Sequence, residues 1–172
     1  MKKVSLLFFL LLAFGSTFAQ NDPLWMRYPS ISPDGKTIVF SYKGDLYKVS
    51  AEGGTALPLT MHEAHDYQPV WSHDGKTIAF ASDRYGNFDV FVMPAEGGTP
   101  TRLTTNSAND YPYDFSTDDQ SVIFGSGRHT VNTNVRFPAG RLFAQLYTVP
   151  VKGGRSVLIS ATGMEHAQYN SD

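Results

Sequence analysis

The chain contains no cysteine among its 172 residues. Disulfide bonds, thiolate metal sites, a cysteine nucleophile and lipid attachment at a lipoprotein cysteine are therefore excluded. An excess of positive charge is also absent, since 14 basic residues face 16 acidic ones. Because nucleic-acid-binding surfaces are strongly basic, the composition argues against a nucleic-acid partner.

A long apolar run is absent except at the N-terminus. There, Lys2 and Lys3 precede an apolar stretch, and a small-residue cleavage position lies between Ala19 and Gln20. This pattern is typical of a secretory signal peptide, and its apolar run is shorter than the roughly 20 residues that span a membrane. We predict a signal peptide over residues 1–19, export to the periplasm or the medium, and no membrane span after its removal.

Sustained helical periodicity is absent as well, and short strand-like runs bounded by turn residues take its place. The segment Ser-Pro-Asp-Gly-Lys-Thr-Ile-Val-Phe at residues 32–40 recurs in related form at residues 72–80 and 116–124. The leading serines are 40 and then 44 residues apart (72 − 32 and 116 − 72), a period typical of β-propeller blades. Each copy therefore predicts one blade of short antiparallel strands.

We predict an all-β fold, a β-propeller of four-stranded antiparallel blades with an incomplete ring. After a lead at residues 20–27, the partial propeller covers residues 28–172. Its blades are expected at residues 28–60, 68–104 and 111–160, with the start of a fourth at residues 161–172. Propellers generally have about four to eight blades, so we interpret the sequence as an N-terminal piece of a longer protein.

The second strand of each copy is apolar or small on both faces. In the second copy, Ile78 and Phe80 alternate with Ala79 and Ala81. A half-exposed sheet would instead alternate apolar and polar residues, so we expect each blade to lie between two neighbours. The preceding turns carry Asp-Gly in two copies, but Asp119 replaces the glycine in the third. Aspartate tolerates a positive φ at some cost.

Residues 71–84, continuing through residues 89–93, resemble the WD40-like propeller repeat of TolB and of the tricorn protease. Prolyl-oligopeptidase-like peptidases contain a propeller with a similar repeat. The resemblance extends over residues 28–172. Tricorn-like serine peptidases fit best, because the first repeat follows the signal peptide almost directly, whereas an α/β domain precedes the propeller of TolB.

The tricorn resemblance implies a division of labour within a larger protein. In tricorn-type proteins an N-terminal propeller precedes a second propeller or linker, a PDZ domain and a serine peptidase core. This chain would then dock or gate peptides and contact the missing C-terminal domains, while hydrolysis occurs beyond Asp172. We predict no catalytic residue, cofactor or metal here. Two alternatives are a TolB-like periplasmic protein-binding propeller without enzymatic activity and the propeller of a prolyl-oligopeptidase-like peptidase.

Candidate peptide contacts fall in two segments. His62 and His65 are three residues apart in an inter-blade loop, which is not the spacing of a helical zinc motif, so we interpret the loop as polar and connecting, with a peptide-facing patch as the alternative. The third copy carries a long insertion, and long loops are often functional. We interpret it first as an extended hairpin that packs against a neighbouring domain. Alternatively, its basic residues could pair with acidic or C-terminal carboxylates of peptides; they are Arg128, His129, Arg136 and Arg141.

Several other polar residues are expected to be structural. Ser126 lacks the G-x-S-x-G spacing of a nucleophile elbow, and Asp83-Arg84 could form an ion pair within a turn. Asp66-Tyr67 recurs as Asp110-Tyr111, which favours a repeated structural role. Asp45, Asp89 and Gln145 hold matching positions before the third strand, where we expect hairpin hydrogen bonds. We expect Trp25 and Trp71 to pack between blades.

Overall fold

The computed structural model describes residues 25–128, 144–161 and 166–170. These residues form twelve β-strands and no helix. Blade 1 consists of β1 (Arg27–Ile31), β2 (Thr37–Tyr42), β3 (Asp45–Ser50) and β4 (Leu57–Pro58). Blade 2 consists of β5 (Asp66–Trp71), β6 (Thr77–Ser82), β7 (Asp89–Pro94) and β8 (Thr101–Arg102). Blade 3 consists of β9 (Asp110–Phe115), β10 (Ser121–Ser126), β11 (Gln145–Pro150) and β12 (Val157–Ser160).

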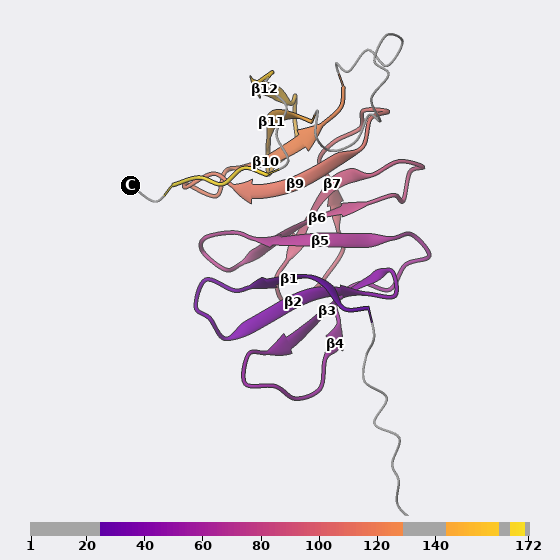
Figure 1. Cartoon of the computed structure of the whole chain (residues 1–172), viewed down its shortest axis with the longest axis vertical. Helices are drawn as coiled ribbons and strands as arrows, with labels where there is room; N and C mark the ends of the chain where they lie inside the picture. The colour runs from indigo at the N-terminus through magenta and orange to yellow at the C-terminus, as the bar shows by residue number, and fades with distance from the viewer. Residues whose placement is uncertain (1–24, 129–143, 162–165, 171–172) are drawn as a thin grey trace, which may run out of the picture.

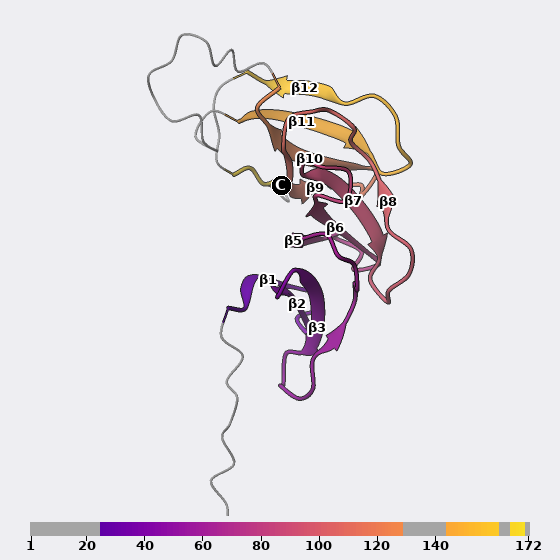
Figure 2. The same ribbon diagram turned by 90° about the vertical axis from the view of Figure 1, so that its right-hand side faces the viewer.

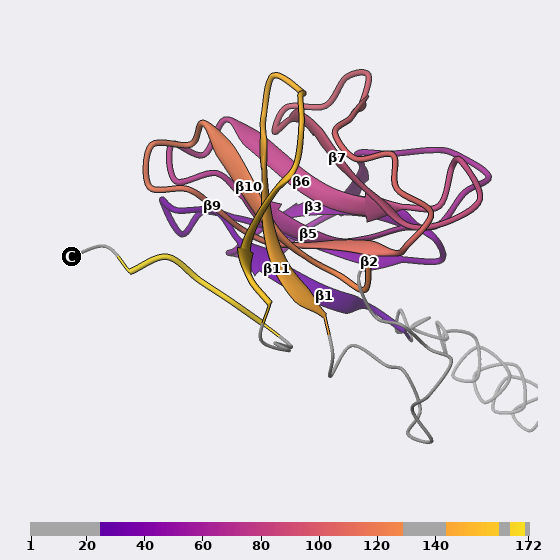
Figure 3. The same ribbon diagram turned by 90° about the horizontal axis from the view of Figure 1, so that it is seen from above.

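Each blade is an antiparallel sheet whose strands pair in sequence order. The sheets are stacked along the long axis of the molecule (Figure 1) and fan into an arc with β1, β5 and β9 on the inner side (Figure 2). Seen from above, β11 crosses over the strands of the other blades (Figure 3). The described residues do not close a ring. The predicted fold class, an all-β incomplete propeller, is therefore confirmed.

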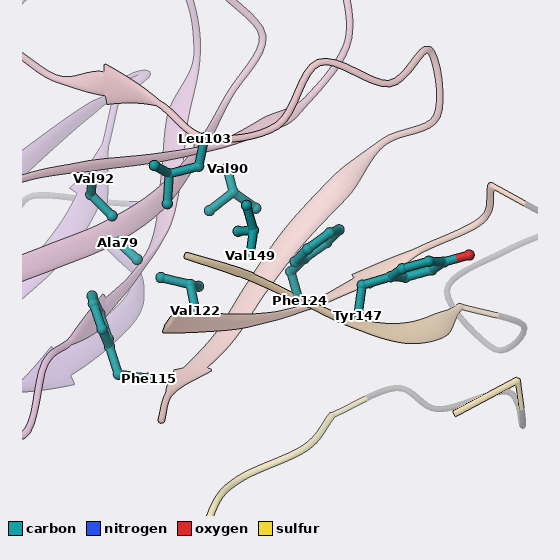
Figure 4. Packing of buried hydrophobic residues seen from close by; sticks show 9 residues of the cluster. All are labelled: Ala79, Val90, Val92, Leu103, Phe115, Val122, Phe124, Tyr147 and Val149. Carbon is teal, nitrogen blue, oxygen red and sulfur yellow. The ribbon is translucent and has the colours of Figure 1, made fainter. Parts of the chain in front are cut away.

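Neighbouring blades pack face to face through apolar side chains. Between blades 2 and 3, Ala79 and Val90 meet Phe124 and Tyr147 in one buried cluster (Figure 4). The predicted double burial is confirmed for β6 and β10, where every residue after the first is buried. In β2, by contrast, Ile38 is only half-buried, because no described blade packs on that side of blade 1.

The serine and aspartate of each repeat build the same turn three times. Ser72 Oγ donates to Asp74 Oδ1 at 2.8 Å and accepts from Thr77 N–H at 2.9 Å. Asp74 Oδ1 also accepts from Lys76 N–H at 2.9 Å. The equivalent bonds recur around Ser32 and Ser116. The repeated motif is thus a side-chain-locked turn between the first and second strands.

Asp119, which replaces the turn glycine in blade 3, holds the turn of blade 2. Its backbone has a φ of 56°, as expected from the sequence. Its carboxylate accepts from His73 N–H at 2.8 Å and from Asp74 N–H at 2.9 Å, and it lies 3.0 Å from His73 Nδ1. The sequence indicated only the energetic cost of a positive φ at Asp119, whereas the structure shows the hydrogen bonds to His73 and Asp74 that offset this cost.

The chain after blade 3 lies beside β9. Tyr169 N–H donates to Asp114 Oδ2 at 2.9 Å, and the rings of His166 and Tyr113 are 5.5 Å apart. This segment occupies the place expected for the inner strand of a further blade, although it forms no strand pairing in the described residues. The fourth blade predicted from residue 161 onward stays a prediction.

The inter-blade role of Asp119 predicts a specific stability defect. We expect Asp119→Gly to lower the free energy of unfolding by about 1 kcal/mol, since the lost hydrogen bonds outweigh the relieved backbone strain. Urea denaturation followed by circular dichroism measures this change. Asp119→Asn, which keeps one acceptor and tolerates a positive φ, should retain part of the stability. An unchanged or raised stability of Asp119→Gly would contradict the role assigned to the carboxylate.

The three locked turns predict an acid-labile component of stability. Hydrogen bonds hold the pKa of each turn carboxyl below its usual value, chiefly from the serine hydroxyl in Asp34 and Asp118 and from Lys76 N–H in Asp74. Such a group stabilises the fold above its unfolded pKa of about 3.9 and loses that contribution as pH falls through the lower folded pKa. We expect Tm to fall below about pH 4, and the triple Asp→Asn variant at these positions to show a shallower fall. An identical acid slope in that variant would exclude these turns as its source.

Candidate functional site

A pocket of about 760 Å³ lies between blades 1 and 2, beside the first residues of β1 and β5. The start of β1, the β2–β3 turn and the loop between β4 and β5 form most of its wall. We call it the β1–β5 pocket. Its lining side chains include Trp25, Arg27, Tyr28, Tyr42, Lys43, His62, Glu63, His65, Tyr67 and Phe88.

The pocket is open because blade 1 has a short hairpin. Lys43 and Gly44 alone join β2 to β3, whereas residues 83–88 join β6 to β7. Gly44 and Phe88 hold equivalent places, since the carbonyl of each accepts a 2.7 Å hydrogen bond from the first residue of the next blade. Lys43 and Gly44 both have a positive φ, as a two-residue hairpin turn of type I′ requires. A glycine at this place leaves the space that Phe88 fills in blade 2.

An aromatic cluster forms the floor of the pocket around Tyr67. The ring centroid of Tyr67 lies 5.2 Å from Tyr28, 5.2 Å from His65 and 4.8 Å from Phe88. Tyr67 is buried, while Tyr28 remains 37% exposed. Tyr28 lies at a β-bulge with a φ of 51°, and bulges commonly redirect a side chain. The floor therefore presents rigid aromatic surface to solvent.

Both histidines predicted as possible peptide contacts lie in this wall. His62 N–H donates to Asp45 Oδ1 at 3.1 Å, and His65 N–H donates to Asp83 Oδ1 at 2.7 Å. These bonds fix the backbone of the loop and leave both side chains exposed. The described residues contain no group of three or more potential ligands placed to hold a metal ion. Peptide contact by these histidines stays a prediction.

A buried ion pair repeats beneath the rim of blades 2 and 3. Asp66 pairs with Arg84, and Asp110 with Arg128, each at 2.6 Å with a carboxylate that is 0% exposed. The expected structural role of the repeated Asp-Tyr pair is therefore confirmed. The turn ion pair considered for Asp83 and Arg84 does not form, because Asp66 binds that guanidinium. The aspartate and the arginine are 18 residues apart in both pairs (84 − 66 and 128 − 110), and this repeated spacing is the sequence feature that could have identified the ion pairs.

The insertion in blade 3 is only partly described. Arg128 lies within the blade, with its guanidinium 4.9 Å from the Phe124 ring centroid and bound to Asp110. A peptide contact through Arg128 stays a prediction, and it would have to share the guanidinium with that carboxylate. His129, Arg136 and Arg141 lie outside the described residues, as do the proposed cleavage residues Ala19 and Gln20.

The remaining candidates separate into buried and exposed residues. Ser126 is 0% exposed at the end of β10 and presents no nucleophile to solvent. Trp71 packs between blades as predicted and donates from Nε1 to the Ser30 carbonyl at 3.1 Å. The prediction for Trp25 is wrong, since its side chain is 72% exposed beside the pocket.

No helix with the length and apolarity to cross a membrane occurs in the described part of the chain.

The aspartates before the third strands form hydrogen bonds, but not within a hairpin. Asp45 Oδ1 accepts from the Thr60 hydroxyl at 3.2 Å, and Asp89 Oδ1 accepts from the Thr104 hydroxyl at 3.3 Å. Both threonines follow the fourth strand of the blade. Burial raises the pKa of Asp89, although Arg102 opposes this by binding the carboxylate at 2.6 Å. These contacts fasten the outer strand and the inter-blade loop.

Comparison with known proteins gives one family and several related structures. The model of the tricorn protease N-terminal β-propeller domain matches residues 23–172. Dipeptidyl-peptidase 5 of Porphyromonas gingivalis is 32% identical over 71 residues, and the match covers 36% of this chain and 10% of the peptidase. A TolB structure from Agrobacterium tumefaciens has a TM-score of 0.67 at 23% identity, covering 83% of this chain and 53% of that one. The crystal structure of the tricorn protease has a TM-score of 0.57 at 17% identity, covering 76% of this chain and 14% of the protease.

These matches differ in what they cover. The chain spans only 10% of the length of the matched peptidase and about half of the TolB chain. The structural likenesses are below 25% identity and show the fold alone. They agree with the three-blade architecture described above.

The buried Asp66–Arg84 pair predicts non-additive mutational effects. We expect Arg84→Met to lower the free energy of unfolding by about 3 kcal/mol, because it leaves a fully buried carboxylate without its cation. The double variant Asp66→Leu/Arg84→Met should recover part of that loss. Denaturation of the single and double variants forms a double-mutant cycle. A double variant less stable than Arg84→Met would show that the pair has another role.

Proposed function

Because the chain belongs to the family of tricorn protease N-terminal β-propeller domains, we propose that it forms the peptide-docking and gating part of a tricorn-like serine peptidase. The observation that supports this proposal is the β1–β5 pocket, with its aromatic floor and exposed basic rim. Pockets of roughly 300–1,000 Å³ suit ligands of small-molecule or short-peptide size. In this proposal hydrolysis takes place in another part of the protein, outside these 172 residues.

Features outside the pocket complete the proposal. Residues 1–19 direct export, with cleavage between Ala19 and Gln20 and delivery to the periplasm or the medium. The basic insertion with Arg128, His129, Arg136 and Arg141 offers a further contact for peptides or for a neighbouring domain of the same protein. No cofactor takes part in the proposed docking role.

A second candidate function is protein binding without hydrolysis, as in a TolB-like envelope propeller. The TM-score of 0.67 with the Agrobacterium tumefaciens TolB structure favours it. A third, the propeller of a prolyl-oligopeptidase-like enzyme, draws support from the 32% identity with dipeptidyl-peptidase 5. All three candidates use the propeller to bind a peptide or a protein, and they differ in whether, and in which domain, a nucleophile is present.

Active-site labelling of the full-length gene product separates these candidates. We expect a fluorophosphonate probe to label the protein covalently, and peptide mapping to place the label outside residues 1–172. A label in a nucleophile-elbow sequence would indicate the prolyl-oligopeptidase-like alternative. Absence of labelling and of peptidase activity, with retention of a bound protein partner, would indicate the TolB-like alternative and contradict the peptidase assignment.

Peptide docking itself is tested at the pocket floor. We expect Tyr28→Ala to weaken binding of a fluorescein-labelled pool of random decapeptides about five- to tenfold, because aromatic anchors carry much of the energy of such sites. Fluorescence anisotropy measures the change. Tyr85→Ala is the matched control, since Tyr85 is 65% exposed and lies outside the pocket lining. Equal effects of the two variants would contradict docking at this pocket.

A further inference from the structure

Two basic side chains on the rim of the β1–β5 pocket form no ion pair with an acidic residue in the described part of the chain. The Arg27 guanidinium lies 4.8 Å from the centroid of the Trp25 ring, and Lys43 Nζ lies 5.3 Å from that of Tyr42. Neither forms an ion pair with any described carboxylate. Elsewhere in the same fold, Arg84, Arg102 and Arg128 each bind an aspartate at 2.6 Å. The two rim cations are therefore available to a ligand.

The charge of the pocket is opposite in sign to that of the chain. Two cations, Arg27 and Lys43, face one lining carboxylate, Glu63, whereas the whole chain has a formal net charge of −2. The nearby carboxylate of Asp66 is fully buried and bound by Arg84, and Asp45 accepts from the Thr60 hydroxyl and His62 N–H. Neither of these two aspartates lines the pocket, and neither forms an ion pair with Arg27 or Lys43 in the described part of the chain. The pocket thus favours a negatively charged ligand, although the chain as a whole has a net negative charge.

Aromatic surface lies next to the cations. Tyr28 and Phe88, packed on the buried Tyr67, line the same pocket as Arg27 and Lys43. A ligand that fits this arrangement has an anionic group beside an apolar one. The rings under Arg27 and Lys43 also restrict their motion before binding, which lowers the entropy cost of pairing with a carboxylate.

We propose that the β1–β5 pocket selects extended peptide segments in which an acidic side chain adjoins an aromatic or aliphatic one. The carboxylate accepts hydrogen bonds from Arg27 and Lys43, and the apolar neighbour rests on Tyr28 and Phe88. Arginine pairs with carboxylates through two parallel hydrogen bonds, which gives the site directional preference. This proposal rests on the proposed docking function and adds the chemistry of the segment that is docked.

Three fluorescein-labelled decapeptides test the selectivity. They share one sequence with a central Xaa-Phe pair, in which Xaa is Asp, Asn or Lys. We expect the Asp peptide to bind about tenfold more tightly than the Asn peptide and the Lys peptide to bind most weakly. Raising the salt concentration to about 0.3 M should reduce the advantage of the Asp peptide, because exposed charges are screened. Anisotropy titrations give the three dissociation constants.

Paired charge variants locate the source of any selectivity. Arg27→Gln/Lys43→Gln should bring the Asp and Asn peptides to within about twofold of each other. Lys152→Gln/Arg155→Gln removes the same charges from the exposed turn between β11 and β12, at the opposite end of the blades, and should leave the tenfold difference intact. Circular dichroism spectra confirm that both double variants are folded.

The outcomes separate this proposal from the docking function. Equal binding of all three peptides, still weakened by Tyr28→Ala, would overturn the acidic preference and leave docking intact. An acidic preference that survives Arg27→Gln/Lys43→Gln would also overturn the proposal, because the selectivity would then reside elsewhere. Absence of binding by every peptide would contradict the docking function and, with it, this inference.

Discussion

Face-to-face packing between blades is the interaction on which the rest of the structure depends. Where two blades meet, the apolar residues on the facing sides of their sheets are buried against each other rather than in a core within one blade. The two blade interfaces that the described residues form use the same positions. Val39 and Leu46 of blade 1 meet the stacked pair Phe80–Phe91, and Ala79 and Val90 of blade 2 meet Phe124–Tyr147.

The turns adapt to each interface rather than repeating unchanged. Between blades 2 and 3, Asp119 binds the backbone N–H groups of His73 and Asp74. Between blades 1 and 2, Pro33 stands at the place of His73 and has no N–H to offer, and Gly75 stands at the place of Asp119. A Cβ added to Gly75 would lie 3.7 Å from Pro33 Cδ. The two positions thus form matched pairs, proline with glycine and histidine with aspartate.

The sequence predicted the fold well because the repeat carries it. The period of the serines, the Asp-Gly turns and the double apolar alternation each correspond to a structural element. The ion pairs were harder to predict, because Arg84 follows Asp83 in sequence but lies against Asp66 across the sheet. Trp25 was misassigned for a similar reason. Aromatic character indicates packing in general, whereas exposure depends on which neighbours are present.

The candidate site arises where the repeat is broken. Blades 2 and 3 each place an Asp–Arg pair beneath the rim, and blade 2 fills the space above its hairpin with Phe88. Blade 1 has Gly44 at the Phe88 position and a two-residue turn with room for no equivalent arginine. The consequence is a cavity bounded by aromatic side chains, with Arg27 and Lys43 on its rim and neither of them paired with a carboxylate among the residues that the structure describes. The shorter hairpin of blade 1 thereby leaves open the pocket at which we propose that a peptide docks.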